Sequence, residues 1–300
     1  MIVFEKVFTL FIFIIVGYLL SKLNRVDRSH SKLLSALLVY VFAPTTVFKS
    51  FSTNFSIENI VSNFQHIAIS AVVLAAISLL ARLISCQMTK HPYERHVYSY
   101  SLTVPNFGYM GYALVASLFG DAALFHFMIF AIPVMIYAYT IGFNTLTKRP
   151  ITLKKLINPS TIALMLGCTA GILHLQLPQT VLDILNTSSG CMAPVSMILA
   201  GIVISEFDLK TLISNKKAYL VTVMRLLVIP LLLGLVLKQF CSEDIVRYGV
   251  MLYAMPCGLN TIVYPKLVGE NCEMGAKFAF LTNIFVCITL PLNLYFLGAL

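Results

Sequence analysis

The chain alternates between long apolar runs and short polar connections along its whole length. A membrane-spanning helix needs about 20 mainly apolar residues, and runs of this kind recur ten times. The ten predicted spans are residues 4–22, 33–51, 66–85, 97–119, 123–144, 159–175, 188–205, 218–237, 247–267 and 275–298. The pattern therefore predicts an all-α integral membrane protein with ten transmembrane helices.

Two of these runs are interrupted near their middle by proline, glycine and asparagine. The residues at the interruptions are Pro105, Asn106 and Gly108 in the fourth run, and Pro256, Cys257, Gly258 and Asn260 in the ninth. Proline removes a backbone donor, and backbone groups freed inside a bilayer must be satisfied by protein or by a water-filled cavity. Matched interruptions in two halves of a chain point to the binding site of a transporter. The alternative is that the prolines only kink packed helices.

The two halves of the chain resemble each other at a spacing of about 150 residues. Pro44 corresponds to Pro194, Pro105 to Pro256, and Gly120-Asp121 to Gly269-Glu270. This spacing indicates duplication of a five-helix unit, and an odd number of spans makes the second unit enter the membrane from the opposite face. We predict a first repeat at 1–147, a basic linker at 148–158 and an inverted second repeat at 159–300.

Composition and charge place the protein in a membrane and orient it there. Charged residues make up 11% of the chain, against about 25% in soluble domains. The net charge of +9 does not indicate nucleic-acid binding, because sixteen of the 21 Lys and Arg residues lie in alternate short loops between spans. Such loops face the cytoplasm, so both termini are predicted on the non-cytoplasmic side of a bacterial inner membrane. The first run lacks a cleavage site and is interpreted as a span, not a signal peptide.

The sequence carries no sign of an enzyme, a metal site or a cofactor. No hydrolase, nucleotide-binding or zinc-protease motif occurs, and the spans hold almost no Asp or Glu away from their ends. Seven widely spaced cysteines without a Cys-x-x-Cys pair argue against disulfides and metal binding. The six histidines lie mostly in loops or at span ends and are interpreted as solvated or interfacial.

The interruptions themselves are the strongest candidates for chemistry. A half-helix that begins at mid-membrane presents free N–H groups and a positive dipole end, which attract an anion. Asn106, Asn260 and Thr261 would add neutral donors and acceptors. The sequence therefore predicts a site for a small anion.

Each of the other polar positions allows a structural and a functional interpretation. Asn158 and Ser160 open the sixth span, either as a helix cap or also facing the cavity. Thr45 and Ser196 sit beside kinking prolines and either bond within their own helices or line the same cavity. Arg225, inside the eighth span, either snorkels to the surface or pairs with Glu206 or Asp208, or it contacts or gates an anion.

Three motifs together resemble the signature segments of the auxin efflux carrier family. They are Val-Pro105-Asn106-x-x-x-Met-Gly111, Asn158-Pro-Ser-Thr161 and Met-Pro256-x-Gly258, and they occur in order over nearly the whole chain. The resemblance implies two inverted five-helix repeats with helices 4 and 9 crossing, a scaffold of helices 1, 2, 6 and 7, and a transport group of helices 3–5 and 8–10. It further implies elevator-type alternating access and a homodimer.

The resemblance also suggests roles for individual residues. Pro105 and Pro256 would be the crossover prolines, and Asn106 would meet the substrate carboxylate. Asn158 and Ser160 match an Asn-Pro-Asn-Thr segment of plant members, but Ser160 replaces the second Asn, which puts auxin-like specificity in doubt. The long hydrophilic loop of many plant members is missing, as in compact prokaryotic members.

The predicted function is secondary transport of small organic anions, such as mono- or dicarboxylates, with proton or sodium coupling left open. One alternative is a sodium-coupled carrier of the bile-acid or sodium/proton antiporter kind, which should show acidic residues near the crossing. A second is a non-transporting receptor or a membrane-embedded enzyme, which should show a soluble domain or catalytic side chains at depth.

Overall fold

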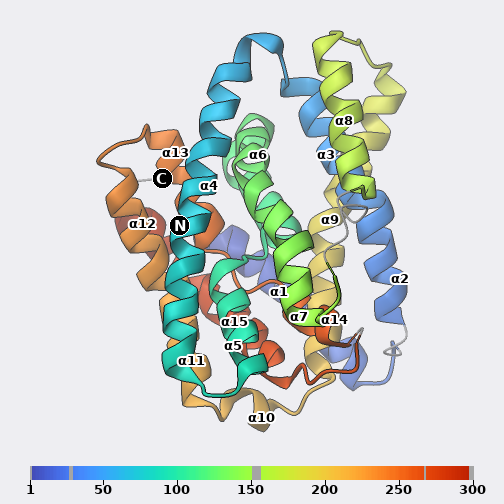
Figure 1. Cartoon of the computed structure of the whole chain (residues 1–300). Coiled ribbons are helices and arrows are strands. Elements are labelled where there is room, and N and C mark those ends of the chain that lie inside the picture. The colour runs from blue at the N-terminus through green and yellow to red at the C-terminus, as the bar shows by residue number, and fades with distance from the viewer. Residues whose placement is uncertain (1, 27–29, 151–156, 267, 297–300) are drawn as a thin grey trace.

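The computed structural model describes residues 2–26, 30–150, 157–266 and 268–296, and this part of the chain is mostly helical (Figure 1). The helices are α1 (Ile2–Lys22), α2 (His30–Leu37), α3 (Ala43–Asn54), α4 (Ile60–Met88), α5 (Pro92–Thr103), α6 (Tyr112–Tyr137), α7 (Phe143–Thr147), α8 (Pro159–Ile172), α9 (Gln179–Ser205), α10 (Leu209–Ile213), α11 (Lys216–Val223), α12 (Ile229–Leu237), α13 (Glu243–Tyr253), α14 (Asn260–Lys266) and α15 (Glu273–Phe296). Four π-helical segments continue these helices: η1 (Leu38–Phe42), η3 (Phe107–Gly111), η4 (Ala138–Gly142) and η6 (Met224–Val228). Part of the predicted basic linker, residues 151–156, lies outside the described residues, as does position 267.

Within the described residues, seven helical segments are long and apolar enough to cross a membrane, and the apolar helix α8 is shorter. The predicted ninth span is absent from this set because it is broken into the short helices α13 and α14. The predicted fourth span is also broken, into α5 and the beginning of the segment Phe107–Thr147, so it does not appear as a segment of its own. The multi-pass, all-helical prediction is confirmed at this level. Several boundaries differ from those predicted: α4 begins at Ile60 and α9 at Gln179, both earlier than the apolar pattern indicates.

The longest apolar segment, Phe107–Thr147, turns back on itself at Gly120. Gly120 has a φ of 83°, a backbone conformation that side chains with a Cβ disfavour. The rings of Tyr112 and Phe127 lie 6.2 Å apart, whereas 15 residues of straight helix would separate them by about 22 Å. The segment is therefore a helical hairpin. Gly269, which corresponds to Gly120 in the sequence repeat, also has a positive φ, 72°.

One set of helices packs backbone against backbone through glycines. A Cβ at Gly201 of α9 would lie 2.0 Å from the carbonyl oxygen of Ile14 in α1, and one at Gly171 of α8 would lie 2.4 Å from that of Phe55, just after α3. Small residues allow this close approach in membrane proteins. We call α1, α3, α8 and α9 the glycine-packed group.

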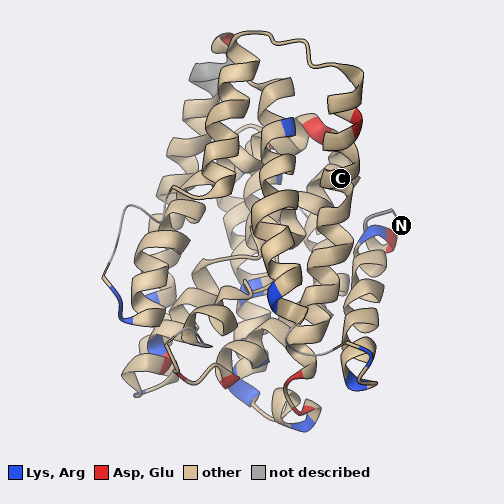
Figure 2. Cartoon of the chain, turned by 90° about the vertical axis from the view of Figure 1, so that its right-hand side faces the viewer, with Lys and Arg blue, Asp and Glu red and all other residues tan. Residues whose placement is uncertain are grey.

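The remaining long helices form a second set around the broken segments. Helix α4 packs on α5 and α6, α12 on α13, and α11 on α15. We call α4, α5, η3, α6 and α11–α15, with η6, the crossing group. Lys and Arg residues gather mainly at one end of the bundle (Figure 2), where α10 and the beginning of α11 lie in Figure 1.

Candidate functional site

The two interrupted helices meet at their breaks near the middle of the bundle. The backbone is extended at Val104, and Pro105 forms an isolated antiparallel β-bridge with Cys257. The backbone N–H of Asn106 donates to the carbonyl of Pro256 over 2.8 Å. The chain thus replaces helical hydrogen bonds by bonds between the two breaks, as the absence of water in a bilayer requires. We call this meeting point the crossing.

The breaks leave carbonyl groups at the ends of α5 and α13, and specific side chains satisfy them. Pro105 has no N–H to offer the carbonyl of Ser101, four residues earlier. The thiol of Cys257 donates to that carbonyl instead, over 3.3 Å, while its own backbone N–H donates to the Thr282 hydroxyl over 3.0 Å. Cys257 therefore ties α5 to α15 through the crossing.

Arg225 connects the C-terminal ends of both broken helices. Its Nη1 donates to the Leu102 carbonyl over 2.6 Å, and its Nε donates to the Met255 carbonyl over 3.1 Å. The side chain is fully buried, so the snorkelling alternative is wrong. A cation at helix C-termini is favourable because the carbonyls there carry partial negative charge. No Asp or Glu occurs in the described segments 98–112, 222–230 and 253–261 that form the crossing.

The position of Arg225 depends on Pro230 and Asn293, which the sequence pattern does not mark as part of a site. Pro230 has no N–H for the Leu226 carbonyl, four residues earlier. Asn293 of α15 donates to this carbonyl over 2.6 Å, and the helix adopts the π-helical segment η6 around Arg225. π-Helical turns often occur at functional sites, and this one carries the buried guanidinium to the crossing.

Buried polar atoms that have no hydrogen-bond partner among the described residues gather at the crossing. They include Nδ2 of Asn106, Nη2 of Arg225, and the hydroxyls of Ser101 and Tyr253. Asn106 is only 3% exposed, and the Tyr253 ring lies 5.9 Å from the Arg225 guanidinium carbon. Unpaired buried donors cost free energy, so a concentration of them marks a place where a ligand would be stabilised.

Two other predicted site residues reach the crossing. The Asn260 amide donates to the Tyr100 hydroxyl over 3.1 Å, from one broken helix to the other. Ser196 of α9 donates to the carbonyl of Tyr109 in η3 over 3.2 Å, so the glycine-packed group contacts the segment that follows Asn106. Gly108 has open space where a Cβ would lie, and a Cβ at Gly258 would lie at ordinary contact distance from the Pro105 carbonyl.

The remaining predicted residues are engaged locally. Asn158 caps α8, accepting from the backbone N–H groups of Ser160 and Thr161 over 3.0 and 3.1 Å. The Thr45 hydroxyl donates to the Val41 carbonyl of its own helix over 2.6 Å. Helix α8 packs mainly on α3. These contacts fit the capping and helix-internal readings of Asn158, Ser160 and Thr45.

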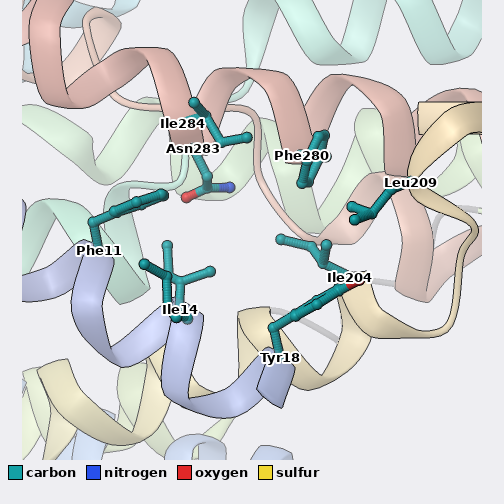
Figure 3. Close-up of a pocket in the computed structure, with 9 residues that line it drawn as sticks. Phe11, Ile14, Tyr18, Ile204, Leu209, Phe280, Asn283 and Ile284 are labelled. Atoms are coloured by element: carbon teal, nitrogen blue, oxygen red, sulfur yellow. The ribbon is translucent and has the colours of Figure 1, made fainter. Parts of the chain in front are cut away.

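A separate cavity lies between the N-terminal helix and the last one (Figure 3). It measures about 140 Å³ and is lined by apolar side chains of α1, α9, α10 and α15, with Asn283 as its polar exception. This cavity is a gap in the packing between the glycine-packed group and α15. Within the described residues no three His, Cys, Asp or Glu side chains gather as metal ligands would.

The comparison with known proteins agrees with this architecture. The profile of a family described as "Membrane transport protein" matches residues 2–155 and 145–294. An uncharacterized transporter of Methanocaldococcus jannaschii is 22% identical, over 97% of this chain and 98% of its own length. Both comparisons indicate a multi-pass membrane transporter, not an enzyme. The chain therefore belongs to this membrane transport protein family, the auxin efflux carrier family that its proline motifs resemble.

Proposed function

We propose that the protein carries small organic anions, with the crossing as its substrate site. The observation that carries this proposal is the set of unpartnered donors on Asn106 and Arg225, beside a buried positive charge and without a carboxylate in the crossing segments. Charge-assisted hydrogen bonds from a guanidinium suit a carboxylate ligand. A mono- or dicarboxylate would satisfy both donors and offset the buried charge.

The fold supports a movement of one helix group against the other. The glycine-packed group would serve as the scaffold, because backbone contacts at Gly201 and Gly171 leave it little freedom to shift. The crossing group would move with the substrate, and the cavity in Figure 3 lies at the boundary between the two groups. Asn106, Arg225 and Cys257 are buried in this conformation, so substrate entry requires that the boundary opens. This is alternating access of the elevator type, and we propose a homodimer as the assembly.

The proposed topology is ten spans in two inverted five-helix repeats, 1–147 and 159–300, joined by the basic segment 148–158. Its supports are the hairpin at Gly120, the matching positive φ at Gly269, and the meeting of Pro105 with Cys257. The basic loops at one end of the bundle (Figure 2) favour an inner-membrane orientation with both termini on the non-cytoplasmic side.

Counterflow in proteoliposomes tests the function and the site separately. Vesicles loaded with unlabelled malonate, malate, succinate or indole-3-acetate would be diluted into the labelled acid, and at least one carboxylate should exchange. Asn106→Ala should lower that exchange about tenfold or more, because one hydrogen bond to a charged group is lost. Asn186→Ala, on the exposed surface of α9, is the matched control. Absence of exchange with every acid would overturn the anion-carrier function, and full activity of Asn106→Ala would overturn the site.

A further inference from the structure

A second polar cluster lies inside the crossing group, away from the crossing. His66 of α4 and His126 of α6 have nearly parallel rings with centroids 5.4 Å apart. Tyr248 of α13 packs against both, with centroids at 5.9 and 6.0 Å. His66 is 7% exposed, so this residue is buried in the bundle and is not a solvated histidine. We call His66, His126 and Tyr248 the histidine cluster.

The surroundings of the histidine cluster are polar but incompletely bonded. Nδ1 of His126 is buried without a hydrogen-bond partner among the described residues. Asn63 and Ser70 lie on the same face of α4 as His66, one helical turn before it and one turn after it, and their buried polar atoms also lack partners among the described residues. An apolar packing cluster would not need this polar face. An imidazole nitrogen with a free lone pair can accept a proton.

We propose that the histidine cluster binds the proton that drives anion transport. The proposal rests on the proposed function and names its coupling ion. Nδ1 of His126 takes one proton from water on one side of the membrane and releases it on the other, and the anion moves in the same cycle. Two positive charges at this ring separation repel each other, so the pair holds one proton at a time. Histidine is the side chain suited to this exchange near neutral pH.

The cluster is placed where a bound proton can influence the crossing. Helix α6 follows η3 and Asn106 directly, while α13 ends at Tyr253 beside the other break. Helix α13 also packs on both α6 and η3. Protonation at the interface of α6 and α13 therefore changes the charge between the two elements that lead into the crossing. Figure 1 shows α4, α6 and α13 side by side at the end of the bundle opposite α10.

The charged groups near the cluster are already arranged in pairs. Asp244 binds Arg247 on α13 over 3.0 Å, and Lys49 of α3 binds Asp121 of α6 over 2.9 Å. Glu58 lies in the short 3₁₀ helix Ile57–Asn59 that precedes α4, and residues 63–81 of α4 carry no charge. Asp244 lies one turn before Tyr248 on α13, and its side chain is largely exposed, so a proton would reach the cluster from this side.

Nitrogen NMR of histidine-labelled full-length protein in nanodiscs tests proton binding without a substrate. Between about pH 5 and 8, the His126 ring should change from charged to neutral, and His66→Gln should move that midpoint because a neighbouring ring is removed. The signal is assigned by its loss in His126→Gln. If the His126 ring stays neutral over this whole pH range, or if its titration midpoint is unchanged in His66→Gln, the cluster serves packing only.

Transport assays distinguish proton coupling from anion transport itself. With the acid that exchanges in the wild-type protein, His66→Gln and His126→Gln should lose the stimulation of uptake by an inward proton gradient while keeping counterflow close to the wild-type rate. His91→Gln is the control, since His91 is exposed before α5 at the other end of the bundle. Gradient-driven uptake that survives in both cluster variants would overturn the coupling site and leave the anion-carrier function standing. If the wild-type protein shows no counterflow with any of the acids, the anion-carrier function itself is overturned.

Discussion

The glycine-packed group and the crossing group differ in how their helices are held together. In the first, α1 meets α9 and α3 meets α8 with almost no side chain between their backbones at Gly201 and Gly171. In the second, helices are interrupted and polar side chains fill the gaps, with Arg225 bound to two carbonyls and Asn293 to a third. Close backbone packing leaves one favourable arrangement, whereas a network of exchangeable polar contacts can have more than one.

This contrast suggests why the candidate site lies in one group and not the other. The buried donors at the crossing that lack a partner among the described residues lie in helices of the crossing group, as Arg225 does, or in the break between α5 and η3, as Asn106 does. The glycine-packed group contributes Ser196, whose hydroxyl is already bonded to carbonyls of Ala193 and Tyr109. The glycine-packed group is rigid and its polar groups at the crossing are hydrogen-bonded, whereas the crossing group has buried donors without partners in the described part of the chain. This arrangement is expected of a scaffold next to a group that binds and moves the substrate.

Of the changes considered, replacement of Arg225 by methionine should have the largest effect on transport, because it alters the crossing group at its buried charge. We expect Arg225→Met to lower anion counterflow by about 100-fold or more, the effect of removing a buried charge that contacts an anion. Folding should change less, because methionine relieves the burial of a charge while it leaves the Leu102 and Met255 carbonyls unpaired. Counterflow and thermal stability, measured on the same preparation, check the two parts.

Arg225→Lys sharpens the result, since it keeps the charge and loses the planar fork that reaches two carbonyls. It should transport more than Arg225→Met and less than wild type. Equal transport by wild type and Arg225→Met would remove the guanidinium from the mechanism.

A methyl group at Gly201 should lower the stability of the glycine-packed group and leave the substrate site unchanged. The added Cβ would meet the Ile14 carbonyl, so Gly201→Ala should lower the free energy of unfolding by about 1–3 kcal/mol. Transport per folded molecule should be little changed. Gly190→Ala, in the same helix with open space around its position, should be neutral or slightly stabilising. If the two variants unfold at the same temperature, the close packing of α1 and α9 is not what holds this group together.

The smallest effect is expected at the beginning of α8. Asn158→Ala removes a cap that accepts from two backbone N–H groups, and such a loss costs about 1 kcal/mol. Because α8 packs on α3, we expect counterflow by Asn158→Ala to keep the wild-type rate. Asn158→Asp preserves the acceptor and should restore stability. A clear fall in counterflow at unchanged stability would instead place Asn158 at the substrate.

The local chemistry of the site could be predicted well from residue types. Proline cannot donate a backbone hydrogen bond, so the breaks at Pro105 and Pro256 follow from the chain itself. The apolar runs likewise dictate a multi-pass helical protein, because only helices satisfy their own backbone in a bilayer. The cap at Asn158 is equally local and was predicted with the correct boundary.

Contacts between distant segments were decided by the tertiary structure alone. The sequence left Arg225 with alternatives, since an arginine in a span can reach water, a carboxylate or a ligand, and only packing shows that it meets the ends of α5 and α13. The roles of Pro230 and Asn293 were missed because a kinking proline looks the same whether or not a partner fills its gap. His66 and His126 are 60 positions apart and become neighbours only when α4 packs against α6. Backbone chemistry is a property of one residue and its neighbours in the chain, whereas a binding site is a property of distances that the chain reaches only after folding.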